Sequence, residues 1–330
     1  MKFSLISPTF GRPEEVTEFL ESLLEQDYSG FEVILGDGTP KDTLRPDLKR
    51  FEDNSTYPLH IVYEEYLSVS DGRNRAAEKA KGEYLIFMDS DCLIPPNYLK
   101  LVEAHLSKHS LDAFGGPDKA HKNFTPLQKA ISFSMTSLLT TGGIRGKQNH
   151  VGTYHPRGFN MGIKASTFNA VGGYSDFRCG EDIELSMRII EQGYSVGFIP
   201  EAFVYHKRRT SLKQFFKQVY RFGAARINIY KRHPKELKVT HFFPLLFSLY
   251  VISSVLGITL LPRSLTLLYQ LSLEIYVIAL FVSATWQSKS MGVGLLAILT
   301  SFTMLYGYAW GFVSNAWAYY VLKMPKGLKL

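Results

Sequence analysis

The sequence of 330 residues has only two cysteines, Cys92 and Cys179. Two cysteines are too few for the disulfide framework of a small secreted domain, and they are typical of a chain that works in a reducing compartment. Intrinsic disorder is excluded as well, because 45% of the residues are apolar and can form a large core. The length alone suggests about two domains.

Charged residues make up 20% of the sequence but are nearly absent after residue 240. Three apolar runs follow, of which the second contains one acid, Glu274: Phe242–Pro262, Ser264–Ser288 and Ser290–Leu322. Each exceeds the roughly 18 residues that indicate a candidate spanning helix. Buried helices of a soluble protein are the alternative, but three such runs in succession leave no polar face for water. The sequence therefore predicts transmembrane or interfacial helices over residues 241–330.

A strongly basic segment, residues 206–240, precedes these runs. Eleven Lys and Arg side chains lie between Lys207 and Lys238, against one acid, Glu236. A Lys/Arg excess beside a first spanning helix keeps that side in the cytoplasm. The chain start, Met1–Pro8, is too short and too quickly polar for a signal peptide. We therefore expect a multi-pass protein of the inner membrane whose first 240 residues are cytoplasmic.

The basic segment also predicts contact with membrane lipids, because each Lys or Arg near an anionic surface contributes about 1 kcal/mol. Nucleic-acid binding is the competing interpretation of the net charge of +7. It is disfavoured, because the segment adjoins an apolar run and no DNA-binding or RNA-binding module is visible.

The C-terminal tail conflicts with three membrane crossings. Three crossings place the tail outside, whereas its lysines favour the inside: Lys323, Lys326 and Lys329. One resolution is that the third run bends near Gly307 to Gly311 and lies partly in the interface. Trp310 and Trp317 would suit an aromatic belt there.

The first 205 residues alternate short apolar runs with helical periodicity. Strands are predicted at Lys2–Ser7, Phe31–Gly36, Leu59–Tyr63, Glu83–Met88, Asp112–Gly115, Ser195–Ile199 and Phe203–Tyr205. Helices are predicted at Pro13–Glu25, Ser70–Lys81, Asn97–Lys108, Glu181–Gln192 and Ser211–Lys231. This alternation predicts a Rossmann-like α/β domain over residues 1–205, with a mainly parallel sheet flanked by helices. Ligands of such sheets bind at the carboxyl ends of the strands.

Two common nucleotide-binding motifs are absent: a Walker A loop and a Gly-x-Gly-x-x-Gly turn after a strand. Instead, the apolar run Tyr84–Met88 leads directly into Asp89-Ser90-Asp91. Carboxylates at a strand end suit Mg²⁺ or Mn²⁺, which bind oxygen ligands and often substrate phosphates. For this tripeptide alone an ordinary polar turn is the stronger interpretation. Further motifs downstream reverse that preference.

These motifs occur in an order that is characteristic as a set: Ser7-Pro8-Thr9, Asp37-Gly38-Thr39, Gly72-Arg73-Asn74, Asp89-Ser90-Asp91, Gly172-Gly173-Tyr174, Gly180-Glu181-Asp182 and Gln218-x-x-Arg221-Phe222. Over residues 3 to 230 the chain resembles the family-2 glycosyltransferases, which have a GT-A fold. It departs from the family pattern in two places. A single Asp37 stands where a double Asp is usual, and Phe222 replaces a tryptophan.

The resemblance implies a nucleotide-sugar donor, most consistent with a UDP-sugar. Asp37 would contact the base, and Pro8 and Thr9 would line the same pocket. Arg73 would approach the diphosphate. Gln218 and Arg221, on a basic helix, would close over the donor or an acceptor phosphate; a solvated helix face is their alternative interpretation.

The resemblance also implies a divalent cation, Mn²⁺ or Mg²⁺, positioned on the diphosphate by Asp89 and more directly by Asp91. His206 would complete the metal shell, or would be an ordinary histidine at a strand end. Asp182 would be the general base with Glu181 its neighbour, although acids at a helix N-terminus also serve as caps.

The function expected is transfer of a single sugar, with inversion, to a hydroxyl of a lipid-linked or membrane-associated glycan in polysaccharide biosynthesis. A processive polysaccharide synthase is one alternative, but two or three helices are too few to enclose a product channel. A non-catalytic nucleotide-binding membrane adaptor is the other, and such a protein has no need of Asp89, Asp91 and Asp182. The segment Gly115–His155 is expected to shape the acceptor site.

Overall fold

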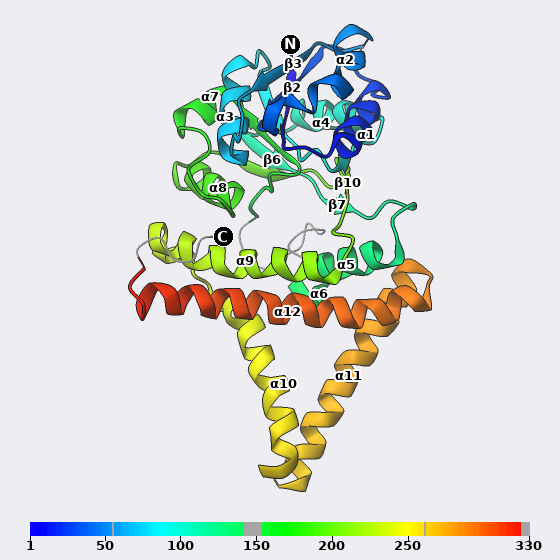
Figure 1. Ribbon diagram of the computed structural model, residues 1–330, viewed down its shortest axis with the longest axis vertical. Coiled ribbons are helices and arrows are strands. Elements are labelled where there is room, and N and C mark those ends of the chain that lie inside the picture. Colours follow the sequence, from blue (N-terminus) through cyan, green and yellow to red (C-terminus); the bar gives the residue numbers. More distant parts are fainter. Residues whose placement is uncertain (55, 142–153, 261, 325–330) are drawn as a thin grey trace. The chain divides into compact units, whose positions relative to one another are not determined.

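The computed structural model describes residues 1–330 except 55, 142–153, 261 and 325–330, which include the tail lysines Lys326 and Lys329. The chain forms two compact units (Figure 1). The first contains Met1–His121 and Ile144–Lys207, and the second contains Lys122–Gly143 and Arg208–Leu330. Part of the expected acceptor segment thus belongs to the second unit. The domain boundaries expected at residues 205 and 240 stay a prediction.

The first unit is built on a mainly parallel sheet, as predicted. Among the described residues this sheet has seven strands in the order β3-β2-β1-β4-β8-β6-β9. They are β1 (Phe3–Thr9), β2 (Phe31–Asp37), β3 (Leu59–Tyr63), β4 (Tyr84–Phe87), β6 (Ala113–Gly115), β8 (Met161–Lys164) and β9 (Val196–Phe198). The strands β3, β2, β1 and β4 are parallel, and β8 runs antiparallel to both its neighbours. The fold class is therefore a mixed, mainly parallel α/β sheet.

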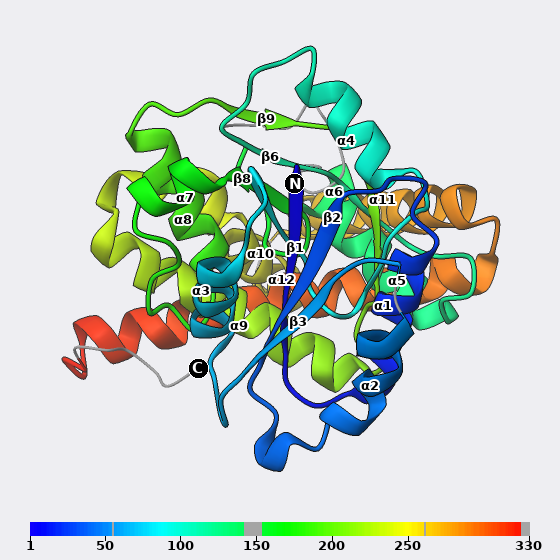
Figure 2. The ribbon, with the colours of Figure 1, turned by 90° about the horizontal axis from the view of Figure 1, so that it is seen from above.

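Helices cover both faces of this sheet (Figure 2). They are α1 (Pro13–Leu24), α2 (Arg45–Asn54), α3 (Val69–Lys79), α4 (Tyr98–Leu106), α7 (Ala165–Ala170) and α8 (Glu181–Glu191). In α1 the buried residues Val16, Phe19, Leu20 and Leu23 recur at helical spacing and form one core stripe. Pro13 occupies the first turn, where its missing N–H costs nothing.

A small second sheet has the strand order β5-β10-β7. Its strands are β5 (Cys92–Leu93), β7 (Asp118–Lys119) and β10 (Val204–His206). In the register, His206 lies opposite Cys92, and Val204 lies opposite Asp118. Three segments far apart in the sequence therefore meet directly after Asp91.

The second unit is helical. It contains α5 (Pro126–Thr136), α6 (Leu138–Thr141), the basic helix α9 (Leu212–Arg232), α10 (Phe243–Leu260), α11 (Arg263–Ser288) and α12 (Met291–Tyr320). Of the helices described, α11 and α12 are long and apolar enough to cross a membrane. The helix α12 is uninterrupted through Gly307 and Gly311, so the expected bend does not divide it (Figure 1).

Candidate active site

Arg73 lies at the centre of the acidic residues predicted for the site. It projects from α3, is 2% exposed, and donates to Asp89 Oδ1 at 2.7 Å and to Glu181 Oε1 at 2.9 Å. Its guanidinium also lies 5.0 Å from the centre of the Tyr174 ring. One buried cation therefore joins the carboxylate that follows β4 to the first residue of α8.

The motifs that contain Arg73 and Tyr174 are joined by a reciprocal pair of hydrogen bonds. The Asn74 side chain donates to the Tyr174 carbonyl at 2.8 Å and accepts from the Tyr174 N–H at 2.8 Å. These bonds fix α3 against the glycine turn before α8. Their geometry explains why two motifs that lie 100 residues apart in sequence occur together.

Asp182 is held at the N-terminus of α8 by backbone donors. Its Oδ2 accepts from the Gly158 N–H at 3.0 Å, and its Oδ1 accepts from the Ile183 N–H at 2.8 Å. Gly180 precedes the helix with a φ of 83°, a left-handed conformation that favours glycine. Backbone N–H groups and the helix dipole both stabilise a charged carboxylate at this position.

The surroundings of Glu181 raise its pKa. Burial raises its pKa, the neighbouring Asp182 raises it further, and Arg73 partly offsets both effects. The two adjacent acids therefore differ in surroundings: Asp182 accepts hydrogen bonds from two backbone N–H groups, whereas Glu181 forms an ion pair with the buried Arg73.

The structure brings Asp91, Cys92 and His206 into a buried group whose potential ligand atoms lie within 4.8 Å of one another. His206 Nε2 is 3.1 Å from Asp91 Oδ1, and His206 Nδ1 is 3.8 Å from Asp118 Oδ2. Carboxylate oxygen and imidazole nitrogen suit Mn²⁺ or Mg²⁺. Burial raises the pKa of the Cys92 thiol, which points to the Phe159 carbonyl at 3.8 Å, so Cys92 is a poor ligand for these cations. Asp91 and His206 thus fit a hard divalent cation.

Asp89 lies outside this group as the structure describes it, because its Oδ1 is engaged by Arg73. Its side chain is 35% exposed, more than that of Asp91 at 11%. The predicted metal role of Asp89 stays a prediction, while its position beside the metal group follows from the short turn after β4.

The predicted nucleotide pocket lies at the ends of β1 and β2. Pro8 is in register with Gly36, and Thr9 with Asp37. Asp37 is 1% exposed, and its Oδ1 accepts from the Thr9 hydroxyl at 2.9 Å and from the Thr39 hydroxyl at 2.6 Å. The other oxygen, Oδ2, is buried and has no hydrogen-bond partner among the described residues.

Close backbone approaches explain why Asp37 is flanked by glycines rather than by a second Asp. A Cβ at Gly36 would lie 2.2 Å from the Gly72 carbonyl oxygen, and one at Gly38 would lie 2.5 Å from that of Leu67. Neither position has room for a side chain. The departure from the family pattern is therefore a packing requirement of α3 and the loop before it.

Gln218 and Arg221 lie on α9 in the second unit, where Gln218 is half-buried and Arg221 is exposed. The predicted roles of Gln218 and Arg221 over the donor or an acceptor phosphate stay predictions. Sequence reasoning assigned no role to three contributors: Gly158, Asp118 and Tyr174. The sequence does carry a signal for Asp118, because this acid follows the predicted strand Asp112–Gly115 after only Gly116 and Pro117. Its position beside β10, however, depends on long-range strand pairing.

Replacing the central cation is expected to destabilise the fold. We predict that Arg73→Met lowers the free energy of unfolding by about 3 kcal/mol at pH 7, because it leaves Glu181 buried without a cation. The pKa of Glu181 is already raised. Protonation removes the need for a partner, so the loss should shrink as the pH falls towards that pKa. Urea unfolding of the detergent-solubilised protein, followed by circular dichroism, measures both quantities.

The matched control is Arg50→Met, which breaks an exposed pair with Glu21. An exposed pair contributes about 1 kcal/mol or less. Equal losses for the two variants, or an Arg73→Met loss independent of pH, would contradict the central role of this guanidinium.

Comparison with known proteins identifies relatives of this sequence. The sequence is 26% identical to the succinoglycan biosynthesis protein ExoA of Rhizobium meliloti over 61% of this chain and 61% of that protein. It is 24% identical to a dolichyl N-acetyl-α-D-glucosaminyl phosphate 3-β-D-2,3-diacetamido-2,3-dideoxy-β-D-glucuronosyltransferase of Methanococcus voltae, over 68% of this chain and 72% of the relative.

The fold is shared with a solved structure, the mannosyltransferase PcManGT of Pyrobaculum calidifontis in complex with GDP-Man and Mn²⁺. The TM-score is 0.62 at 16% identity, over 91% of this chain and 86% of that one. The GT-A fold expected from the sequence is therefore confirmed. The family model for glycosyl transferase family 2 matches residues 4–170, half of the chain. This protein belongs to glycosyl transferase family 2.

Proposed function

We propose that the protein transfers a single sugar, with inversion, from a UDP-sugar to a hydroxyl of a lipid-linked or membrane-associated glycan. The observation that carries this proposal is the fixed carboxylate of Asp182, beside the Arg73–Asp89–Glu181 cluster of the same unit. A group of acids so arranged supports proton abstraction next to a charged leaving group.

Asp37 supports uracil as the donor base. Its buried Oδ2 accepts no hydrogen bond from any residue that the structure describes. A buried acceptor without a donor is costly, and the imide N–H of uracil would supply one. Guanine also offers an N–H to a carboxylate, so the nucleotide must be measured.

In this proposal Asp182 is the general base. In a single displacement it takes the proton of the acceptor hydroxyl while that oxygen forms a bond to the anomeric carbon. The bond from that carbon to the diphosphate breaks on the opposite side, the nucleoside diphosphate leaves, and the configuration inverts. A base positioned in this way contributes about 10²–10⁴-fold to the rate.

Asp91 and His206 would hold the divalent cation, with Asp89 beside them. When bound, such a cation neutralises the charge that develops on the departing diphosphate. Arg73 would act mainly by holding Asp89 and Glu181 in place, because its guanidinium is buried and engaged by both carboxylates.

Two observations support a lipid-linked acceptor. The segment Lys122–Gly143, part of the region expected to shape the acceptor site, belongs to the same unit as the long apolar helices. The name of the Methanococcus voltae relative specifies a dolichyl-phosphate-linked sugar. The sugar itself and the acceptor linkage are questions for assay.

Release of the nucleoside diphosphate from a panel of UDP-sugars, GDP-mannose and other nucleotide sugars tests this function. We expect release from a UDP-sugar only, only with Mn²⁺ or Mg²⁺, and with stimulation by membrane extracts that contain the acceptor. Products one sugar longer than the acceptor support single transfer, whereas long polymers would show a processive synthase. Binding without turnover under all conditions would favour the adaptor.

The first unit is expected on the cytoplasmic face of the inner membrane, on account of the basic residues of 206–240. Protease added to intact spheroplasts should leave this unit uncut, whereas it should be digested in inside-out vesicles. Cleavage of the first unit from the outside would overturn this placement.

A further inference from the structure

The helix α12 is two-sided along its whole length. Its buried residues recur at helical spacing from one end to the other: Val293, Gly294, Ala297, Thr300, Ser301, Met304, Leu305, Gly307, Ala309, Gly311, Phe312, Asn315 and Ala318. Its exposed apolar residues lie on the other side in two groups, Leu295 and Leu299 in the first half and Trp310, Val313, Trp317 and Tyr320 in the second. Although its composition suits a membrane span, 44% of its most apolar stretch is buried inside the protein, against 11% for α11.

The buried side of α12 lies along the basic helix α9, and the two helices run in the same direction. A Cβ on Gly311 would lie 1.9 Å from the Tyr220 carbonyl oxygen, and one on Gly223 would lie 2.0 Å from that of Tyr308. Further along, Asn315 donates to the Ala224 carbonyl at 2.7 Å. The backbones are thus closely packed, so we expect the two helices to keep this common orientation at a membrane.

The preceding half of α12 is held by α5. The Ser134 hydroxyl lies 2.6 Å from that of Thr300 and 3.1 Å from that of Ser301, all three buried. These polar contacts and the α9 contacts together hold α12 from about residue 300 to residue 315. The helix has no free stretch long enough to turn into a bilayer on its own.

The charge of α9 decides where this pair of helices lies. Six cations project from its 21 residues: Lys213, Lys217, Arg221, Arg226, Lys231 and Arg232. Charged side chains of this kind are strongly disfavoured in hydrocarbon and are favoured at an anionic headgroup surface. Because α12 lies along α9, we expect α12 to stay at the headgroup surface as well.

The helices α10 and α11 have different surroundings. The 18 residues of α10 carry no charge, and α11 has cations only at its ends, Arg263 at its start and Lys289 directly after it. Most large apolar side chains of α11 are exposed, including Leu268, Ile275 and Trp286. The two helices contact each other through the stacked rings of Tyr250 and Tyr269.

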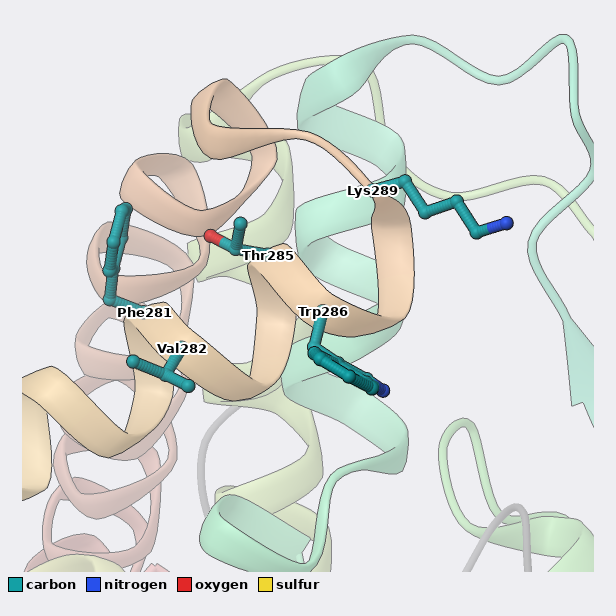
Figure 3. Close-up of a pocket in the computed structure, with 5 residues that line it drawn as sticks. All are labelled: Phe281, Val282, Thr285, Trp286 and Lys289. Atoms are coloured by element: carbon teal, nitrogen blue, oxygen red, sulfur yellow. The ribbon is translucent and has the colours of Figure 1, made fainter.

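A shallow pocket at the end of α11 marks the expected water boundary. It is lined by Phe281, Val282, Thr285, Trp286 and Lys289, with the Lys289 side chain extending away from the others (Figure 3). Trp286 is 85% exposed. A tryptophan beside a lysine at a helix end is typical of the level at which hydrocarbon meets headgroups.

From these observations we propose that α10 and α11 form a hairpin that crosses the bilayer twice, whereas α12 lies in the plane of an anionic phospholipid surface. Its exposed apolar side faces the hydrocarbon, and Lys323 lies on the same side of the membrane as α9. This inference rests on the proposed membrane attachment. With two crossings instead of three, the lysines of the tail lie on the cytoplasmic side, as their charge favours.

The depth of two tryptophans tests the in-plane position. Trp310 and Trp317 are seven residues apart on the exposed side of α12, about 10 Å along the axis. Each is left as the single tryptophan by Trp→Phe substitution of the other two, in full-length protein in phosphatidylglycerol–phosphatidylethanolamine vesicles. Quenching by lipids brominated at different depths should place both at one shallow level. A depth difference of about 10 Å would show that α12 crosses and would overturn the proposal.

Two positions of α11 provide the matched control. Leu268 and Ile275 are also seven residues apart and are 60% and 59% exposed. Leu268→Trp and Ile275→Trp, each as the single tryptophan, should differ in depth by about 10 Å. Equal depths in α11 would overturn the crossing hairpin. Failure of the protein to bind vesicles at all would instead refute the membrane attachment, and would leave the catalytic proposal standing.

Thiol labelling tests the sidedness independently. In a Cys179→Ser background, where the remaining Cys92 is buried, cysteines are introduced at the exposed positions Lys235, Arg263 and Lys323. An impermeant maleimide should label Lys235→Cys and Lys323→Cys from one side, and Arg263→Cys from the other. Labelling of Lys323→Cys together with Arg263→Cys would show three crossings and would overturn the proposal.

Discussion

Asp182→Asn is expected to lower the rate of sugar transfer by about 10²–10⁴-fold while donor affinity stays close to that of the wild type. The amide cannot take the acceptor proton. It keeps the shape of the side chain and one acceptor oxygen, which can accept from the backbone N–H of either Gly158 or Ile183 but not from both. Calorimetry with the nucleoside diphosphate and a transfer assay with the lipid acceptor measure the two effects separately.

Glu181→Gln is the matched comparison, because it makes the same chemical change at the adjacent position. It should reduce the coupling to Arg73 and lower stability without removing the base. Transfer by Asp182→Asn within a few-fold of the wild type would mean that Asp182 is a helix cap. If Glu181→Gln then lost transfer, Glu181 would be the base.

Asp91→Ala is expected to abolish metal-stimulated transfer, with a loss of about 10³-fold or more. Stabilisation of a leaving diphosphate by a cation is worth several kcal/mol, and each 1.36 kcal/mol is a factor of ten. Asp91 provides the carboxylate nearest His206, at 3.1 Å. Electron paramagnetic resonance of Mn²⁺ in the presence of UDP should show weakened binding even where turnover is undetectable.

Asp91→Asn serves as the isosteric second variant, in case the alanine disturbs the buried group. Asp42→Asn, outside the metal group, is the control and should bind Mn²⁺ normally. Metal-dependent turnover by a folded Asp91→Ala protein would refute the metal assignment. Loss of turnover with unchanged Mn²⁺ binding would place Asp91 elsewhere in the reaction.

The four parallel strands β1, β2, β3 and β4 were predictable because each lies in a mainly apolar run of four to seven residues, such as Phe31–Asp37. The three-residue strands β6 and β9 also lie within predicted runs, and β10 overlaps one. Three other short strands were missed. The strand β8 has four residues and is antiparallel, and β5 and β7 have two residues each. Strands this short leave no periodicity to read, and long-range pairing alone defines them.

The helix α5 was also missed, although its start carries a clear signal. Thr125 and Gln128 form a capping box, and Pro126 occupies the first turn. The body of the helix, with Ser132 and Ser134 among its buried residues, has no polar face to contrast with an apolar one. The Ser134 hydroxyl lies within hydrogen-bond distance of hydroxyl groups on α12, and the sequence does not identify these partners.

In the candidate site, too, the local sequence identified some features, whereas others depend on contacts between distant segments. Spacing identified Asp89, Asp91, Glu181 and Asp182 as acids at strand and helix ends. It did not predict that Arg73 would be buried between two of them, because that requires α3 to pack next to the start of α8. Burial of a charged side chain is decided by tertiary partners rather than by its own local sequence.

Residues 122–143 belong to the helical unit although they lie between two parts of the first unit in the sequence. This arrangement limits how the first unit can be produced on its own. A chain ended at Lys207 would keep every residue of the first unit but would also keep α5, with Ile131, Phe133 and Met135 deprived of their contacts with α9, α11 and α12. Such a fragment would present a newly exposed apolar helix in the middle of its sequence and would tend to aggregate. A stop codon after Lys207 would therefore not be enough to give a soluble catalytic fragment. Residues 122–143 would also have to be removed and replaced by a short linker.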